Sequence, residues 1–148
     1  MKTLMYLVLA LGVGGAMSIQ LGVNMRLGGW THDPIITAFI SFVVGSLTLL
    51  AMIFLLRLPC PNFGEISQVP WWQWLGGMLG AYVVASSILV GPHLGTTTTF
   101  AFIVAGQLAA SLVLDHYGMF GVPKHPIGLL RVLGICMVCA GAVLIRRF

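Results

Sequence analysis

The sequence predicts an all-α membrane protein with about five transmembrane helices, and two observations carry this prediction. Of the 148 residues, 59% are hydrophobic and only 7% are charged, whereas about 25% are charged in an ordinary soluble domain. The charged residues are also spaced so that the stretches between them match the roughly 20 apolar residues that cross a bilayer core. No alternating pattern of useful length is present, so we do not expect a β-barrel.

Taken in order along the chain, the uncharged stretches predict each helix. The first two end at Arg26 and Arg57, and the third, from Glu65 to Asp115, is long enough for two helices divided at Pro92. The first stretch exceeds the apolar core of a cleaved signal peptide, so we expect it to be retained. The expected helices lie at about 3–26, 34–56, 70–91, 96–115 and 127–146, in a single transmembrane domain spanning residues 1–148.

Proline and tryptophan support these boundaries. Prolines are found at expected helix ends, where their missing backbone N–H costs least; they are Pro34, Pro70, Pro92 and Pro126. Tryptophans cluster near the same ends, as in the aromatic belt of a membrane interface; they are Trp30, Trp71, Trp72 and Trp74.

Lysine and arginine are almost evenly divided between the two sides of the membrane. Five helices place the termini on opposite sides, so one side carries Lys2, Arg57, Lys124 and Arg131. The other side carries Arg26, Arg146 and Arg147. The difference in lysine and arginine between the two sides, which orients a membrane protein, is therefore a single residue. Two interpretations stay open: one orientation set by other details, or insertion both ways with pairing of inverted copies.

The size of the chain bears on the same question. Five helices are few to enclose a solute pathway with two gates. Many secondary transporters consist of two repeats of inverted topology, with the solute near the midplane between them. An antiparallel dimer of this chain would supply the second repeat.

Polar residues within the expected helices are the candidates for lining a solute pathway, because an unpaired polar group in hydrocarbon is costly. Serine and threonine often bond back to their own helix, whereas a buried amide either joins helices or faces a solute. Gln20 and Asn24 share a face of the first helix, with Gln20 roughly 8 Å from the centre of the span. The candidate pathway residues are Gln20, Asn24, Tyr82, Ser86, Gln107 and Ser111.

No aspartate or glutamate lies deep in any expected helix. An exporter of cations that exchanges them for protons usually needs a titrating group in its cavity. Asp115, near an interface, is therefore the candidate titrating or gating residue. We expect a neutral, zwitterionic or weakly charged solute.

Small residues predict how the helices pack and begin. Gly76 and Gly80, four residues apart, form a candidate contact face for a neighbouring helix. One of the threonines at 96–99 is expected to cap the fourth helix.

No catalytic or metal-binding constellation is apparent in the sequence. The cysteines lack the companions of a metal framework, and we interpret them as small hydrophobic residues; they are Cys60, Cys136 and Cys139. We expect no enzymatic activity, no metal, no cofactor and no nucleic-acid partner.

Several short motifs together resemble the YdcZ-like family of half-size bacterial inner-membrane proteins in the drug/metabolite transporter superfamily. They are QLGVNMRLG at 20–28, PWWQWLGG at 70–77, GPHLGTT at 91–97, GQ at 106–107 with DHYG at 115–118, and GAVLIR at 141–146. The resemblance covers the whole chain. It implies one five-helix half of a ten-helix, inverted-repeat transporter in the bacterial inner (cytoplasmic) membrane, and it names no solute.

We therefore expect a secondary transporter of small organic solutes that works by alternating access as an antiparallel dimer. Its partners would be the lipid bilayer, the solute, and a second copy or a sister subunit in inverted orientation. Two alternatives stay open: a dual-topology channel for a small ion, and a non-transporting membrane assembly protein.

Overall fold

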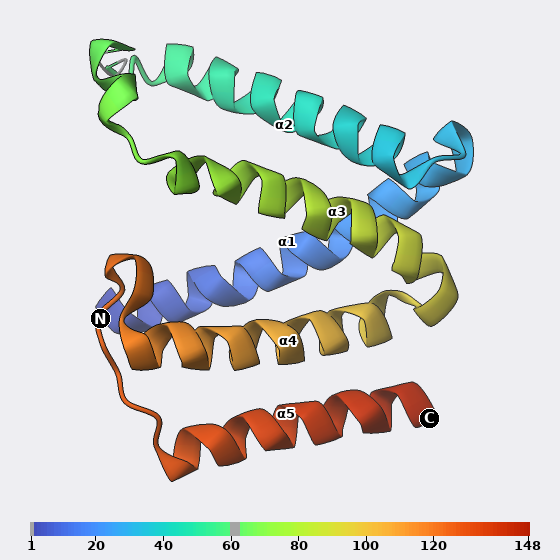
Figure 1. The fold of residues 1–148 in the computed structure, drawn as a ribbon. Coiled ribbons are helices and arrows are strands. Elements are labelled where there is room, and N and C mark those ends of the chain that lie inside the picture. The colour runs from blue at the N-terminus through green and yellow to red at the C-terminus, as the bar shows by residue number, and fades with distance from the viewer. Residues whose placement is uncertain (1, 60–62) are drawn as a thin grey trace. The chain divides into compact units, whose positions relative to one another are not determined.

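A computed structural model of the chain describes residues 2–59 and 63–148. Cys60, which lies between the second and third expected helices, falls outside these ranges. Five long α-helices account for most of this part of the chain (Figure 1). They are α1 (Lys2–Thr31), α2 (Pro34–Leu55), α3 (Leu75–Leu94), α4 (Thr96–Tyr117) and α5 (Leu129–Arg147). Short 3₁₀ turns connect them: η1 (Phe63–Gln68), η2 (Trp71–Trp74) and η3 (Met119–Gly121). Each long helix is long and apolar enough to span a membrane, so the all-helical class with five spans is confirmed.

The helix ends differ from the sequence boundaries by a few residues. α1 continues past Arg26 to Thr31, because a charge marks the edge of the hydrocarbon and not the end of the helix. Its 30 residues make a rod of about 45 Å, longer than a bilayer core of about 30 Å.

The third helix differs at both of its ends. The tryptophan segment is a 3₁₀ turn, so the α-helix begins at Leu75 and not near residue 70. The helix also continues through Pro92 to Leu94, because a proline in the last turn removes only one backbone hydrogen bond.

The expected threonine cap of α4 is wrong. Gly95 caps that helix with a φ of 78° and no side-chain hydrogen bond. This left-handed backbone region favours glycine. Thr99 instead donates its hydroxyl to the Gly95 carbonyl at 2.7 Å.

The chain forms two compact units, Met1–Leu89 and Val90–Phe148. In the first unit, α1 and α2 are antiparallel, meet at their connecting turn and diverge away from it (Figure 1). Buried residues of this unit come from α1, the start of α2 and the later part of α3; they are Leu21, Asn24, Thr37, Ala38 and Ile88. A Cβ atom at Gly28 would lie 3.4 Å from Ile88 Cγ2, so α1 and α3 approach closely there.

The turn between α1 and α2 is held by a compact hydrogen-bond network. Asp33 is the N-cap of α2, and its Oδ1 accepts from the backbone N–H groups of Ile35 at 2.7 Å and Ile36 at 2.9 Å. The Thr37 hydroxyl donates to the Asp33 carbonyl at 2.8 Å and also pairs with the Thr31 hydroxyl. Asp followed by Pro at the first helical position is a strong start signal. The network therefore fixes how α2 leaves the turn.

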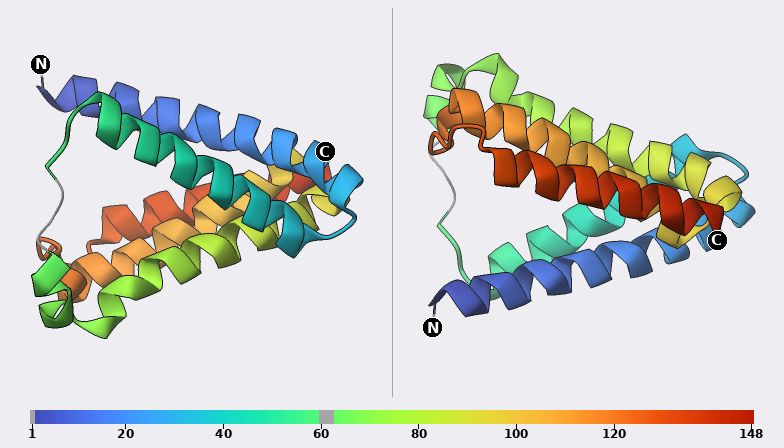
Figure 2. Two further views of the ribbon diagram at one scale, coloured as in Figure 1. Left: turned by 90° about the horizontal axis from the view of Figure 1, so that it is seen from above. Right: turned by 90° about the horizontal axis from the view of Figure 1, so that it is seen from below.

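The second unit consists mainly of α4 and α5, which are antiparallel and lie side by side in both views of Figure 2. α4 ends at Gly118, whose φ of 63° is left-handed and whose N–H donates to Leu114. This is the glycine termination common at helix C-termini.

Candidate functional site

The candidate pathway residues fall into both units. Gln20, Asn24, Tyr82 and Ser86 belong to the first unit. Gln107, Ser111 and Asp115 all lie on α4 in the second unit. The two groups are therefore described one after the other.

A polar recess lies between α1 and α2 and has a volume of about 200 Å³. Gln20 contributes from α1, and residues from one face of α2 complete the wall. On a helix, positions three, four, seven and eight residues apart lie on one face, so two adjacent rows of α2 side chains form this wall. The α2 residues are Ser41, Phe42, Gly45, Ser46 and Leu49. Among all the residues that line this recess, only Gln20 was a candidate site residue. The sequence alone does not distinguish Ser41 and Ser46 from serines that bond to the backbone of their own helix.

The hydroxyls in this recess differ from most of those elsewhere in the unit. Four hydroxyls bond back to the carbonyl four residues earlier, as expected of serine and threonine in helices; they belong to Ser18, Thr37, Thr48 and Ser87. By contrast, Ser41 and Ser46 make no side-chain hydrogen bond within the described part of their unit, and neither does Gln20. The recess therefore holds an amide and two hydroxyls that are available to another molecule.

Asn24 lies one turn along α1 from Gln20, toward the α1–α2 turn. Its relative exposure is 6%, yet its amide has no hydrogen-bond partner among the described residues of this unit. In the described ranges, every polar side-chain atom that is completely inaccessible to solvent has a hydrogen-bond partner. The Asn24 amide therefore keeps a small solvent-accessible surface. A buried amide without a partner costs about 1–3 kcal/mol, which favours water or a solute at this position.

An apolar recess of about 390 Å³ lies between α2 and α3. Tyr82 is on its α3 side and is 70% exposed, so the ring is at the edge of the recess. The remaining lining residues are Ile35, Ala38, Phe39, Phe42, Ala81 and Ala85. Ser86 is half-buried on α3 and lines neither of the two recesses.

Phe42 is common to the polar and the apolar recess. Its ring rests against Gly80, where an added Cβ atom would lie 3.4 Å from Cζ. The expected partner glycine, Gly76, has open space around the same position. Of the two predicted packing glycines, only Gly80 therefore contacts a neighbouring helix within this unit.

On α4, Gln107 and Ser111 are exposed, and their side chains make no hydrogen bond within the described second unit. Gln107 lies near the middle of the helix. An amide in contact with lipid is unfavourable by several kcal/mol. We therefore expect the Gln107 amide to contact water or protein groups outside the second unit.

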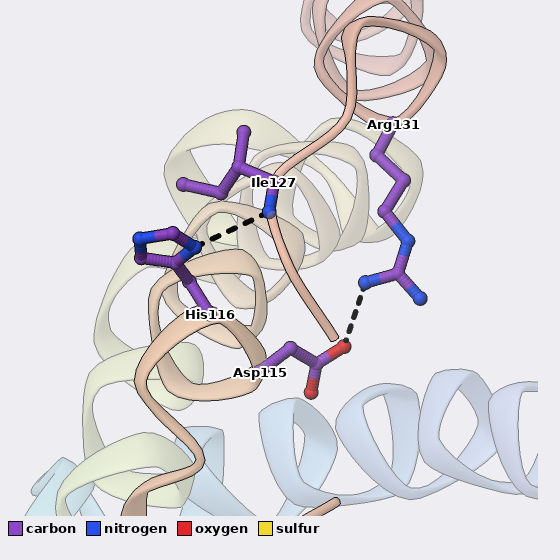
Figure 3. A network of polar contacts seen from close by, with 4 residues as sticks. All are labelled: Asp115, His116, Ile127 and Arg131. Atoms are coloured by element: carbon purple, nitrogen blue, oxygen red, sulfur yellow. Dashed lines mark hydrogen bonds and ion pairs between the residues drawn. The ribbon is translucent and has the colours of Figure 1, made fainter. Parts of the chain in front are cut away.

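Asp115 follows Gln107 and Ser111 at four-residue spacing on α4 and makes an ion pair. Its Oδ2 lies 3.3 Å from Arg131 Nη1 at the start of α5 (Figure 3). Its carbonyl accepts from the His125 N–H at 2.8 Å. Next to it, His116 Nδ1 accepts from the Ile127 N–H at 3.2 Å (Figure 3). These contacts tie the connection between α4 and α5 to the end of α4.

Within the described residues, no group of three or more metal-ligating side chains comes together. Cys136 and Cys139 are free thiols on an exposed part of α5.

Comparison with known proteins identifies the family. Residues 5–144 match the family model described as "Putative inner membrane exporter, YdcZ". The chain is 31% identical over 146 residues to a protein of Escherichia coli (strain K12) named "Inner membrane protein YdcZ", covering 98% of this chain and 95% of that protein. No solved structure matches the chain significantly. The chain therefore belongs to the YdcZ family, an exporter family and not an enzyme family, and it is a multi-pass transporter of the bacterial inner membrane.

Proposed function

We propose that this protein exports small, uncharged organic solutes by alternating access and works as an antiparallel dimer. The observation that carries the proposal is the polar recess between α1 and α2. It combines the Gln20 amide with the hydroxyls of Ser41 and Ser46, none of them hydrogen-bonded within the described unit. Polar groups at membrane depth without partners mark a water-filled or solute-filled pathway.

The chemistry of the recess selects the class of solute. None of the described lining residues carries a charge, so no counter-ion is available for a charged solute. An amide and two hydroxyls can each donate and accept hydrogen bonds. A neutral molecule with both donors and acceptors, such as an amide or a polyol, fits these groups best.

Two exposed polar residues of α4 support the proposal of a second copy. Gln107 and Ser111 are at membrane depth without hydrogen bonds in the described second unit. An inverted copy would let such groups face a shared aqueous pathway, as in transporters built from inverted repeats. In a homodimer, the two end states would have equal energies by symmetry. The nearly balanced distribution of lysine and arginine fits insertion in both orientations.

The proposal is tested by measuring which solutes leave the cell. Cells that lack related exporters would express the protein, and the medium would be profiled for small neutral solutes. We expect the wild-type chain to enrich a set of them, and Gln20→Leu to abolish the enrichment. Ser18→Ala is the matched control on α1, because the Ser18 hydroxyl already donates to Gly14. Identical profiles for wild type and Gln20→Leu at equal protein levels would contradict the proposal.

Counterflow separates a carrier from a channel or an assembly protein. Proteoliposomes that contain unlabelled exported solute should take up more labelled solute than proteoliposomes without it. Alternating access predicts this gain in labelled uptake, because unlabelled solute inside competes with labelled solute for the inward-facing site and slows the exit of the label. A channel would show flux without this gain, and an assembly protein would show no flux.

A further inference from the structure

We propose that Phe42 determines the specificity of the solute site by separating the polar recess from the apolar one. This inference rests on the proposed function, since it assigns a role to the wall of the proposed solute site. Phe42 contributes to both recesses, and both lie within the first unit. Among the described lining residues, Phe42 is the one that the two recesses share.

The two recesses differ in the polar groups that they offer, although both have largely apolar walls. The polar recess of about 200 Å³ contains the amide of Gln20 and two hydroxyls. The recess of about 390 Å³ between α2 and α3 has apolar walls, and Tyr82 is the described lining residue that adds a polar group, its hydroxyl. In this proposal, the Phe42 ring is the barrier between a solute bound at Gln20 and the recess beside α3. The apolar part of such a solute is then kept out of that recess.

Gly80 is a positioning residue for this ring. An alanine Cβ at position 80 would make an ordinary van der Waals contact with the ring at 3.4 Å. A larger side chain would occupy the space of the ring itself. A glycine at position 80 therefore leaves room for the ring of Phe42 against α3.

The consequence is a size limit that a single substitution removes. Phe42→Ala would join the two recesses and expose apolar surface to a solute bound at Gln20. The protein should then accept neutral solutes that carry larger apolar groups. Phe39 provides a matched control, because it lines the apolar recess and not the polar one.

Thiol alkylation tests the wall without requiring a known solute. In a chain lacking its three native cysteines, Ser41→Cys would place one thiol in the polar recess. Its reaction with N-ethylmaleimide, N-cyclohexylmaleimide and N-benzylmaleimide would be timed in native membranes. We expect the larger reagents to react slower by about tenfold or more, because forcing an oversized group into a packed site costs on the order of 1.4 kcal/mol. Phe42→Ala should remove this difference and Phe39→Ala should keep it.

The outcomes separate this inference from the proposed function. If reagents of all sizes react equally fast with the Phe42 ring present, Phe42 is not a wall, while the polar recess still contains water. If no reagent reacts, the recess is closed to water and both proposals are wrong. Size exclusion that Phe42→Ala relieves and Phe39→Ala does not would support both. Equal amounts of each variant in the membrane, measured by immunoblot, control for folding.

Discussion

Asp115 and Arg131 form an ion pair that joins the last turn of α4 to the first turn of α5, with Oδ2 and Nη1 3.3 Å apart. The two residues are 16 positions apart in sequence. The side chains are 45% and 30% exposed for Arg131 and Asp115, so water screens the pair. Asp115, the candidate titrating residue, is therefore already engaged within its own unit.

This pair predicts a modest effect on stability. Asp115→Asn or Arg131→Gln should destabilise the protein by about 0.2–1 kcal/mol, the usual range for a solvent-exposed ion pair. The exchange Asp115→Arg with Arg131→Asp should recover part of the loss. Thermal aggregation midpoints in detergent would measure the effect. If both single variants keep the wild-type midpoint, the ion pair does not hold α4 to α5.

The N-cap of α2 predicts a larger effect. Asp33→Ala should destabilise the protein by about 1 kcal/mol, because the N–H groups of Ile35 and Ile36 lose their acceptor. Asp33→Ser keeps an N-cap oxygen and should stay close to wild type. Unfolding midpoints of the two variants can be compared in the same detergent. Equal midpoints for alanine and serine would show that the cap contributes little.

The recess hydroxyls predict a contrast between residues of the same helix. Ser41→Ala and Ser46→Ala should each lower export several-fold, since a lost hydrogen bond to a solute is worth about 1 kcal/mol. Thr48→Val should leave export unchanged, because the Thr48 hydroxyl already donates to Val44 at 2.9 Å. Initial rates of solute appearance in the medium would be compared at matched protein levels. Equal losses in all three variants would point to a general effect on α2.

The contact between Gly80 and Phe42 predicts a graded response. Gly80→Ala should be tolerated, because its Cβ would make only an ordinary contact with the ring. Gly80→Leu should displace the ring and change which solutes are exported. Gly76→Leu is the matched control within α3, since the Cβ position of Gly76 faces open space within the chain. The profile of exported solutes distinguishes these variants, and an unchanged profile for Gly80→Leu would argue against ring placement by Gly80.

The all-helical class with five spans could be predicted from charge spacing and span length, because the thickness of the bilayer imposes both. Helix ends were less predictable: Arg26 marks a membrane edge inside α1, and Pro92 lies within the last turn of α3. The N-cap of α4 was also predicted wrongly. Threonine is a common N-cap residue, so the four threonines at 96–99 were favoured over Gly95, whose positive φ cannot be recognised in the sequence.

The candidate site was predictable only in part. Gln20 and Asn24 could be found because amides are rare and costly in a membrane span. Ser41 and Ser46 could not be separated from Ser18 or Thr48 by sequence, because the difference lies in whether each hydroxyl bonds to its own helix. The position of Phe42 between two recesses depends on the packing of α2 against its neighbours, which helical spacing alone does not specify.

The orientation of the C-terminus tests the central proposal, an antiparallel dimer of identical chains, most directly. A single cysteine would follow Phe148 in a chain lacking Cys60, Cys136 and Cys139. Intact cells would be labelled with a membrane-impermeant thiol reagent and compared with permeabilised cells. The proposal predicts that about half of the chains are labelled in intact cells, since dual insertion requires so small a bias of charge. Labelling of all chains or of none would show a single orientation and would contradict the antiparallel homodimer.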